Sequence, residues 1–345
     1  MSSQNVFLLG PGYIGREVID RLLENGFKVT TLVRRKDAVP ELEKDGINTV
    51  MGSMDDKDVI TEQTSKSDIV IHTASADHIE SVEAVIDGID QRANLGQPTI
   101  YIHTSGCSFL SDNSDGKYRS DLIYNDTRPE KLDERPDSAS HRGIDLAIIK
   151  ARQRLGTKAK IFIMLPPLIY GVARSGRLSI QTITMARFAI KHKYAGYVGG
   201  GKSVWGLVHV NDLSYGYLTM LQWLISSPPE VALEHPYFFC ENGEELSWGE
   251  IAACIGQSLY DAKVLPDATP RQIPTEQYND LFGPYSLVVI GQNARNRAER
   301  LRALGWKPKD LDAYAAFKKE ELPVLLKETG EFSGYGRAAA SGATG

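Results

Sequence analysis

One short glycine pattern near the start of the chain limits its possible folds more than any other feature. The run Leu8-Leu9-Gly10-Pro11-Gly12-Tyr13-Ile14-Gly15 has the form G-x-G-x-x-G. It follows a short apolar stretch that is typical of a strand, and it opens a stretch with apolar side chains at helical spacing. Gly10 permits a tight turn, Gly12 lets the backbone approach a pyrophosphate, and Gly15 allows close packing of helix on strand. The pattern predicts a dinucleotide-binding loop, with phosphates at the helix N-terminus; the alternative is a glycine turn without a ligand.

The first half of the chain alternates short apolar runs with amphipathic stretches. This alternation is typical of βαβ units around a buried parallel sheet. We expect strands at residues 6–10, 28–33, 48–51, 69–73, 99–104 and 160–165. The predicted fold is α/β: a Rossmann, doubly wound parallel sheet with a smaller C-terminal substrate-binding lobe.

From Pro166 onward, glycine and proline turns separate helical stretches such as 180–191 and 213–224. Residues near the end of the chain are rich in Gly, Ala and Ser, so they bury too little apolar surface to offset an ordering entropy of about 1–2 kcal/mol per residue. We divide the chain into an NADP-binding Rossmann domain and a substrate-binding lobe, followed by a flexible tail. The Rossmann domain spans 1–170 with 204–225 returning to it, the lobe spans 171–203 and 226–330, and the tail spans 331–345.

Composition narrows the class of partner. A net charge of -5 without a basic stripe argues against nucleic acid, and no apolar stretch approaches the roughly 20 residues of a membrane span. The three cysteines are far apart in the sequence, so neither a disulfide framework nor a metal site is implied. We therefore expect a cytoplasmic protein that binds a small-molecule substrate; nothing in the sequence indicates an oligomer.

The residues after the second expected strand select between the two nicotinamide cofactors. NAD-selective folds carry an acidic residue there, which binds the ribose 2'-hydroxyl. This chain has Arg34 and Arg35 instead, and a guanidinium pairs with a 2'-phosphate that a carboxylate would repel. The sequence thus favours NADP(H), with Met54 after the third strand placed against the adenine; the alternative is a solvated basic turn.

Three further segments carry a family resemblance. They are Thr104-Ser105-Gly106, the run Pro166-Pro167-Leu168-Ile169-Tyr170-Gly171, and Val208-His209-Val210-Asn211-Asp212. With the glycine loop and Arg34, they make residues 4–225 resemble the extended short-chain dehydrogenase/reductase superfamily, in its atypical epimerase/dehydratase-like and NmrA-like branch. The resemblance implies a seven-stranded sheet, with cofactor contacts from Thr73, Ala74, Thr104, Pro167 and Leu168.

The resemblance breaks at the catalytic positions. Active members of the superfamily use a Tyr-x-x-x-Lys pair, in which the lysine lowers the pKa of the tyrosine. The corresponding positions here hold His141 and Asp145, and the usual catalytic hydroxyl position holds Gly106, so Thr104 or Ser105 would have to substitute.

Two replacements for the missing acid are open. His141 and Asp145, four residues apart on one helix, can pair and serve as a proton donor, or can simply cap and pack the helix start. Tyr124 lies in the long polar stretch 111–136, which is either a lid over the nicotinamide or a solvated loop.

The sequence therefore predicts an NADP(H)-dependent oxidoreductase acting on a small organic carbonyl or alcohol without the usual Tyr/Lys pair. One alternative is a non-catalytic NADP(H)-binding redox sensor resembling NmrA-like proteins. Another is a non-redox epimerase or isomerase on the same fold.

Overall fold

A computed structural model describes residues 4–330 and 332–335 of the 345-residue chain. Its centre is a seven-stranded sheet in the order β11-β7-β5-β4-β1-β2-β3, with every neighbouring pair parallel. The strands are β1 (Asn5–Leu9), β2 (Lys28–Val33), β3 (Asn48–Met51), β4 (Ile69–His72), β5 (Thr99–Thr104), β7 (Ala159–Leu165) and β11 (Tyr237–Phe239). The strand order reverses between β1 and β4, which is where ligands bind in such sheets.

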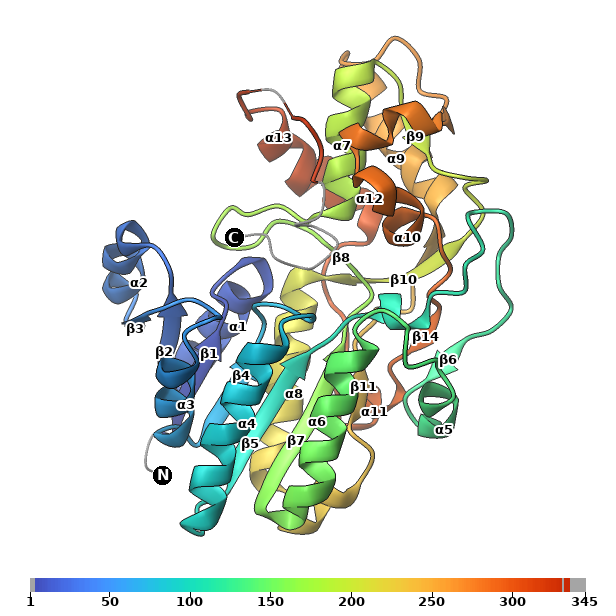
Figure 1. Cartoon of the computed structure of the whole chain (residues 1–345). Coiled ribbons are helices and arrows are strands. Elements are labelled where there is room, and N and C mark those ends of the chain that lie inside the picture. Colours follow the sequence, from blue (N-terminus) through green and yellow to red (C-terminus); the bar gives the residue numbers. More distant parts are fainter. Residues whose placement is uncertain (1–3, 331, 336–345) are drawn as a thin grey trace.

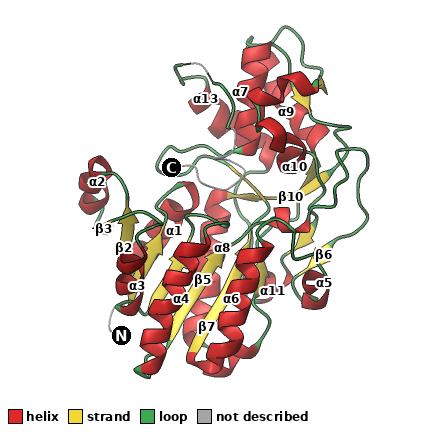
Figure 2. Cartoon of the chain, in the orientation of Figure 1, coloured by secondary structure: helices red, strands yellow, loops and turns green. Residues whose placement is uncertain are grey.

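Helices cover both faces of this sheet (Figures 1 and 2). One layer holds α3 (Lys57–Ser65), α4 (Ile79–Asn94) and α6 (Arg142–Leu155), and the other holds α1 (Tyr13–Glu24) and α8 (Val210–Ser226). Strands such as β4 and β5 are buried along their whole length, as a sheet covered on both sides requires. The doubly wound prediction is confirmed.

A smaller lobe lies beyond the carboxyl ends of the strands (Figure 1). Its helices are α7 (Gln181–His192), α9 (Trp248–Asp261), α10 (Ser286–Ile290), α12 (Ala313–Ala316) and α13 (Leu322–Leu325). Short strands connect it to the main sheet: β8 (Leu168–Tyr170), β10 (Val204–His209) and β12 (Glu245–Ser247) form one small sheet, β9 (Gly196–Tyr197) pairs with β13 (Arg271–Gln272), and β6 (Tyr124–Asn125) pairs with β14 (Asn296–Arg297). The remaining α-helices of the described residues are α2 (Val39–Lys44), α5 (Pro129–Asp133) and α11 (Glu299–Ala303).

The structure divides the chain differently from the expected boundaries in two places. The seventh strand, β11, comes from the region 226–330 that we assigned to the lobe, because three residues are too few to form a recognisable strand pattern. Within 204–225, α8 packs on α1 as expected, but β10 pairs with β8 and β12 outside the main sheet.

The structure describes only part of the expected C-terminal tail. Of the expected tail 331–345, residues 331 and 336–345 lie outside the described residues. Within the part that is described, the Tyr335 amide donates to the Leu281 carbonyl at 2.8 Å, and the Tyr335 ring stacks on Phe282. In the described ranges 4–330 and 332–335, no helix has the length and apolarity of a membrane span.

Candidate functional site

A cleft of 830 Å³ opens at the carboxyl ends of the central strands, and residues of both the main sheet and the lobe line it. Most of the residues that we predicted for the site line it. They are Gly10, Gly12, Tyr13, Ile14, Arg34, Arg35, Met54, Thr73, Ala74, Thr104, Ser105, His141 and Pro167. Gly15, Leu168, Tyr124 and Asp145 are the predicted residues that do not.

The glycine loop has the shape that a bound diphosphate needs. Gly10 has φ +90°, and a side chain there would overlap the backbone of Ala74. A Cβ on Gly15 would overlap the Gly10 carbonyl oxygen, so Gly15 serves the packing of α1 on β1 and not the cleft surface. A Cβ on Gly12 would meet only Arg177 Nη1, at 3.7 Å. The backbone at Gly12 therefore faces open space at the start of α1, and a dinucleotide phosphate fits there.

The basic residues Arg34 and Arg35 follow β2 and line the same cleft as the glycine loop. Arg34 and Arg35 are both exposed. Arg35 lies 3.7 Å from the Asp37 carboxylate, while the Arg34 side chain has no hydrogen bond or ion pair within the described part of the chain. An unpaired guanidinium that lines the same cleft as Met54 and Ser53 has the charge and donors that a ribose phosphate needs.

Leu168 is placed differently from the prediction. It is 1% exposed within β8, and it faces the interior of the small sheet. Pro167, one residue earlier, lines the cleft, and Leu168 does not.

His141 is the centre of a hydrogen-bonded chain in the cleft wall. Its Nε2 lies 2.6 Å from the Ser108 hydroxyl oxygen, and its Nδ1 lies 2.7 Å from the Asp77 carboxylate. All three residues line the cleft. A carboxylate at Nδ1 fixes the imidazole tautomer and orientation, and leaves Nε2 to exchange a proton with the hydroxyl. The arrangement can deliver a proton to a substrate oxygen, or remove one.

The expected His141–Asp145 pair does not form. His141 precedes α6 with a left-handed φ of +65°, so the helical spacing of four does not bring its ring to Asp145. Asp145 instead accepts a hydrogen bond from the Ser105 hydroxyl at 3.0 Å. Burial raises the pKa of the Asp145 carboxyl to about 7, although His141 and Ser105 act to lower it. Asp145 lies behind Ser105 and away from the cleft surface.

Tyr124 does not lie over the cleft either. It is 7% exposed in β6, and its phenol oxygen accepts a hydrogen bond from Arg135 at 3.3 Å. The stretch 111–136 is anchored to the lobe, because the Asn293 side-chain amide donates to Asp112 at 3.0 Å and to the Tyr118 carbonyl at 3.1 Å. The hypothesis of Tyr124 as the acid in a lid is therefore wrong.

Sequence reasoning missed Ser108, Asp77 and Arg177. Asp77 is 64 residues from His141, so no spacing pattern connects them. Ser108 lies four residues after Thr104, in the 3-10 helix Cys107–Leu110, beyond the usual hydroxyl position. Arg177 comes from the loop between β8 and α7, in a region that we assigned only to the lobe.

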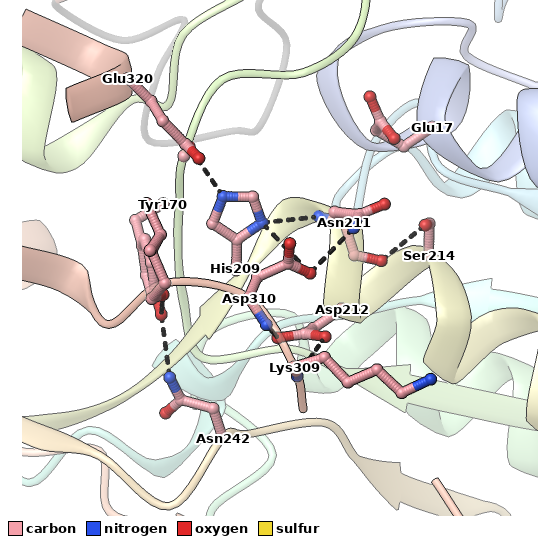
Figure 3. Close-up of polar contacts among 12 residues, drawn as sticks. Glu17, Tyr170, His209, Asn211, Asp212, Ser214, Asn242, Lys309, Asp310 and Glu320 are labelled. Carbon is pink, nitrogen blue, oxygen red and sulfur yellow. Dashed lines mark hydrogen bonds and ion pairs between the residues drawn. The ribbon is translucent and has the colours of Figure 1, made fainter. Parts of the chain in front are cut away.

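A second polar cluster joins the lobe to the main domain (Figure 3). His209 Nε2 lies 2.9 Å from Glu320, and His209 Nδ1 accepts from the Asn211 amide at 3.2 Å, which caps α8. Asp212 accepts from the backbone amides of Lys309 and Asp310 at 2.9 and 3.1 Å. The Val-His-Val-Asn-Asp segment thus holds the C-terminal segment against β10 and α8.

Comparisons with known proteins support an NAD(P)H-binding domain at the start of the chain. A family model described as NAD(P)H-binding matches residues 10–118. The chain is 28% identical to oxidase ucsJ of Acremonium sp, covering 93% of this chain and 99% of that protein. It is also 28% identical to the decarboxylating sterol-4-alpha-carboxylate 3-dehydrogenase of Dictyostelium discoideum, covering 62% of this chain and 66% of that protein.

Solved structures share the fold. UDP-glucose 4-epimerase of Thermotoga maritima, in a structure with UDP-glucose, matches with a TM-score of 0.63 at 15% identity, covering 91% of this chain and 96% of that one. dTDP-glucose 4,6-dehydratase of Bacillus anthracis, in complex with NAD, matches with a TM-score of 0.64 at 12% identity, covering 94% of this chain and 96% of that one.

Proposed function

Because the chain belongs to the extended short-chain dehydrogenase/reductase superfamily, we propose that it is an NADP(H)-dependent oxidoreductase acting on a small organic carbonyl or alcohol. The observation that carries the proposal is the chain Ser108–His141–Asp77, which lines the same cleft as the glycine loop. In this account His141 and Ser108 take over the proton transfer that other members assign to tyrosine and lysine.

Ser108, His141 and Asp77 each have a distinct task in the proposed proton transfer. A nicotinamide cofactor supplies hydride chemistry when it is bound. The Ser108 hydroxyl contacts the substrate oxygen and passes it a proton, and His141 Nε2 replaces that proton. Asp77 accepts from Nδ1, so it keeps the ring in place and stabilises the imidazolium that supplies the proton. In the oxidative direction the same three groups run the transfer backwards.

The cofactor form is proposed from the charges around the ribose. Arg34 is exposed and without an ion pair in the described residues, at the position where NAD-selective folds place a carboxylate. Asp37 and Glu41 also line this end of the cleft, but Asp37 lies beside Arg35. A 2'-phosphate would give Arg34 its partner, so NADP(H) is the preferred form.

A redox sensor needs only cofactor binding, and would leave the Ser108–His141–Asp77 chain without a task. Purified protein incubated with NADPH and a panel of carbonyl compounds should consume NADPH with at least one of them. His141→Ala should lower kcat by about 100- to 10,000-fold, the usual contribution of a positioned acid, with unchanged NADPH affinity.

His192 provides the matched control. It also pairs with a carboxylate, Asp280 at 2.8 Å, but it lies outside the cleft. His192→Ala should keep kcat within about twofold of the parent, a change of under about 0.5 kcal/mol. Tight NADPH binding without turnover of any carbonyl would favour the sensor, and full activity in His141→Ala would remove the proposed proton donor.

A further inference from the structure

Beside the polar Ser175, Arg177 and Gln181, the lobe side of the cleft carries an apolar wall. This wall comes from β8, β10, the start of α7 and the segment before and within α10. The residues are Ile169, Ile180, Trp205, Tyr285, Val288 and Val289. Val288 is 44% exposed, so its side chain offers uncovered apolar surface at the cleft rim.

The indole N–H of Trp205, the largest of these side chains, already has a hydrogen-bond acceptor inside the protein. The Trp205 indole N–H donates to the Gln292 carbonyl at 2.7 Å, and its ring centroid lies 5.7 Å from that of Trp248. Trp205 is 3% exposed, and it presents no donor to the cleft. A ligand against this wall gains by burying apolar surface, at about 25 cal/mol per Å².

The cations of the cleft all lie on the dinucleotide side. Arg34 and Arg35 follow β2, and Arg16 is engaged by Asp20 at 2.9 Å and by Asp45. Arg177 lies beside Gly12. Apart from these four, the described lining residues include no lysine or arginine.

A second diphosphate would therefore have no further lysine or arginine in the described lining to pair with. It would also lie near the Asp77 carboxylate and against apolar side chains. Burying an unpaired anion in such surroundings costs several kcal/mol. The charge distribution disfavours a nucleotide-sugar substrate, although structural neighbours bind such compounds.

We infer that the substrate is an uncharged compound with a largely apolar ring body and a ketone, or the corresponding secondary alcohol, as its reacting group. This inference rests on the proposed function, which places the carbonyl beside Ser108. In reduction, the carbonyl carbon gains the hydride of NADPH, the oxygen gains the proton passed on by Ser108, and NADP⁺ remains.

The test measures binding, so it does not depend on turnover. Protein saturated with NADP⁺ is titrated by calorimetry with three apolar ketones, cyclohexanone, 2-decalone and 2-tetralone, and with UDP-glucose. At least one bicyclic ketone should bind at least about tenfold more tightly than UDP-glucose, which corresponds to about 1.4 kcal/mol.

A pair of variants locates the site. Val288→Asp places a carboxylate in the apolar wall, and should weaken ketone binding about tenfold or more without changing NADP⁺ affinity. Ile225 is similarly exposed, at 37%, but lies on α8 outside the cleft. Ile225→Asp should leave both affinities unchanged.

The outcomes separate the two proposals. The inference is overturned if none of the three ketones binds or if UDP-glucose binds more tightly than they do. It is also overturned if the ketone affinity is unchanged in Val288→Asp. If a ketone binds as expected but NADPH does not reduce it, the proposed reaction fails and the assigned substrate class stands.

Discussion

The Asp145 carboxyl is buried behind Ser105, which lines the cleft. It is fully buried, Ser105 donates to its Oδ2, and its Oδ1 has no partner among the described residues. Burial disfavours the charged form and raises the pKa of this carboxyl to about 7. Near neutral pH a large share of Asp145 is therefore protonated, and it supports Ser105 without placing a full charge behind the cleft.

This raised pKa predicts the pH dependence of stability. The unfolded chain ionises Asp145 near its ordinary pKa of about 3.9, whereas the folded chain keeps it protonated up to about pH 7. The folded state binds the extra proton, so the contribution to stability is complete below pH 3.9 and is lost as the pH rises toward 7. Asp145→Asn removes this titration. Between pH 5 and pH 8, its free energy of unfolding should fall by about 2.5 kcal/mol less than that of the parent.

Urea denaturation at the two pH values measures the difference. Some pH dependence should remain in Asp145→Asn, because burial also raises the pKa of Glu321 to about 7. Equal pH dependence in the parent and in Asp145→Asn would show that Asp145 titrates normally in the folded protein.

At the scale of one element, the glycine loop separates a folding role from a binding role. A Cβ on Gly15 would overlap the Gly10 carbonyl and lie 2.5 Å from Thr73 Oγ1. Gly12 has a negative φ of −85°, and a Cβ there meets Arg177 at an ordinary distance. The two glycines of one motif should therefore respond differently to the same substitution.

Gly15→Ala should lower the free energy of unfolding by about 1–3 kcal/mol, because α1 must move away from β1. Gly12→Ala should change that free energy by less than about 0.5 kcal/mol, yet weaken NADPH binding at least tenfold, because a methyl group occupies the phosphate position. Thermal or urea unfolding gives the first quantity and calorimetry the second. A stable Gly15→Ala variant, or a Gly12→Ala variant with normal NADPH affinity, would contradict this division.

Most strands of the main sheet could be predicted from the sequence, but β11 and the contacts of His141 could not. The first five strands and β7 lie within one residue of their expected bounds, because each is a short run rich in apolar and β-branched residues between turn residues. The strand β11 has only three residues, and its place beside β7 depends on a long connection. The hydrogen bonds of His141 to Ser108 and Asp77 depend on its left-handed φ, and periodicity carries no signal for that conformation. Cofactor positions follow from a local motif, while the proposed proton donors require the folded chain.

At the scale of the whole molecule, the loop between β8 and α7 brings two arginines, Arg174 and Arg177, to the start and the outer face of α1, and among the described residues only Arg174 is bonded to it. Arg174 Nη1 lies 2.5 Å from Glu24, and its Nε lies 3.7 Å from the buried Glu17 carboxylate. Arg177, three residues later, makes no side-chain hydrogen bond or ion pair within the described part of the chain, and it lies beside Gly12. Arg174 thus holds the lobe in place, and Arg177 is free to bind a phosphate on the cofactor.

Arg177→Ala should weaken NADPH binding by about tenfold, the value of one charge-assisted hydrogen bond, and leave unfolding unchanged within about 0.5 kcal/mol. Arg174→Ala should instead lower the free energy of unfolding of the free protein by about 1 kcal/mol and leave NADPH affinity unchanged. Calorimetry and urea denaturation on both variants check the pair. Equal NADPH affinity in Arg177→Ala and the parent would show that the lobe takes no part in holding the cofactor.

The central claim is that the cleft binds a dinucleotide whose ribose carries an extra phosphate. Calorimetric titration of the purified chain with NADPH and with NADH tests it directly. NADPH should bind at least about tenfold more tightly than NADH, and Arg34→Ala should remove that difference, because the guanidinium loses its phosphate partner. No heat with either nucleotide, or tighter binding of NADH, would contradict the account.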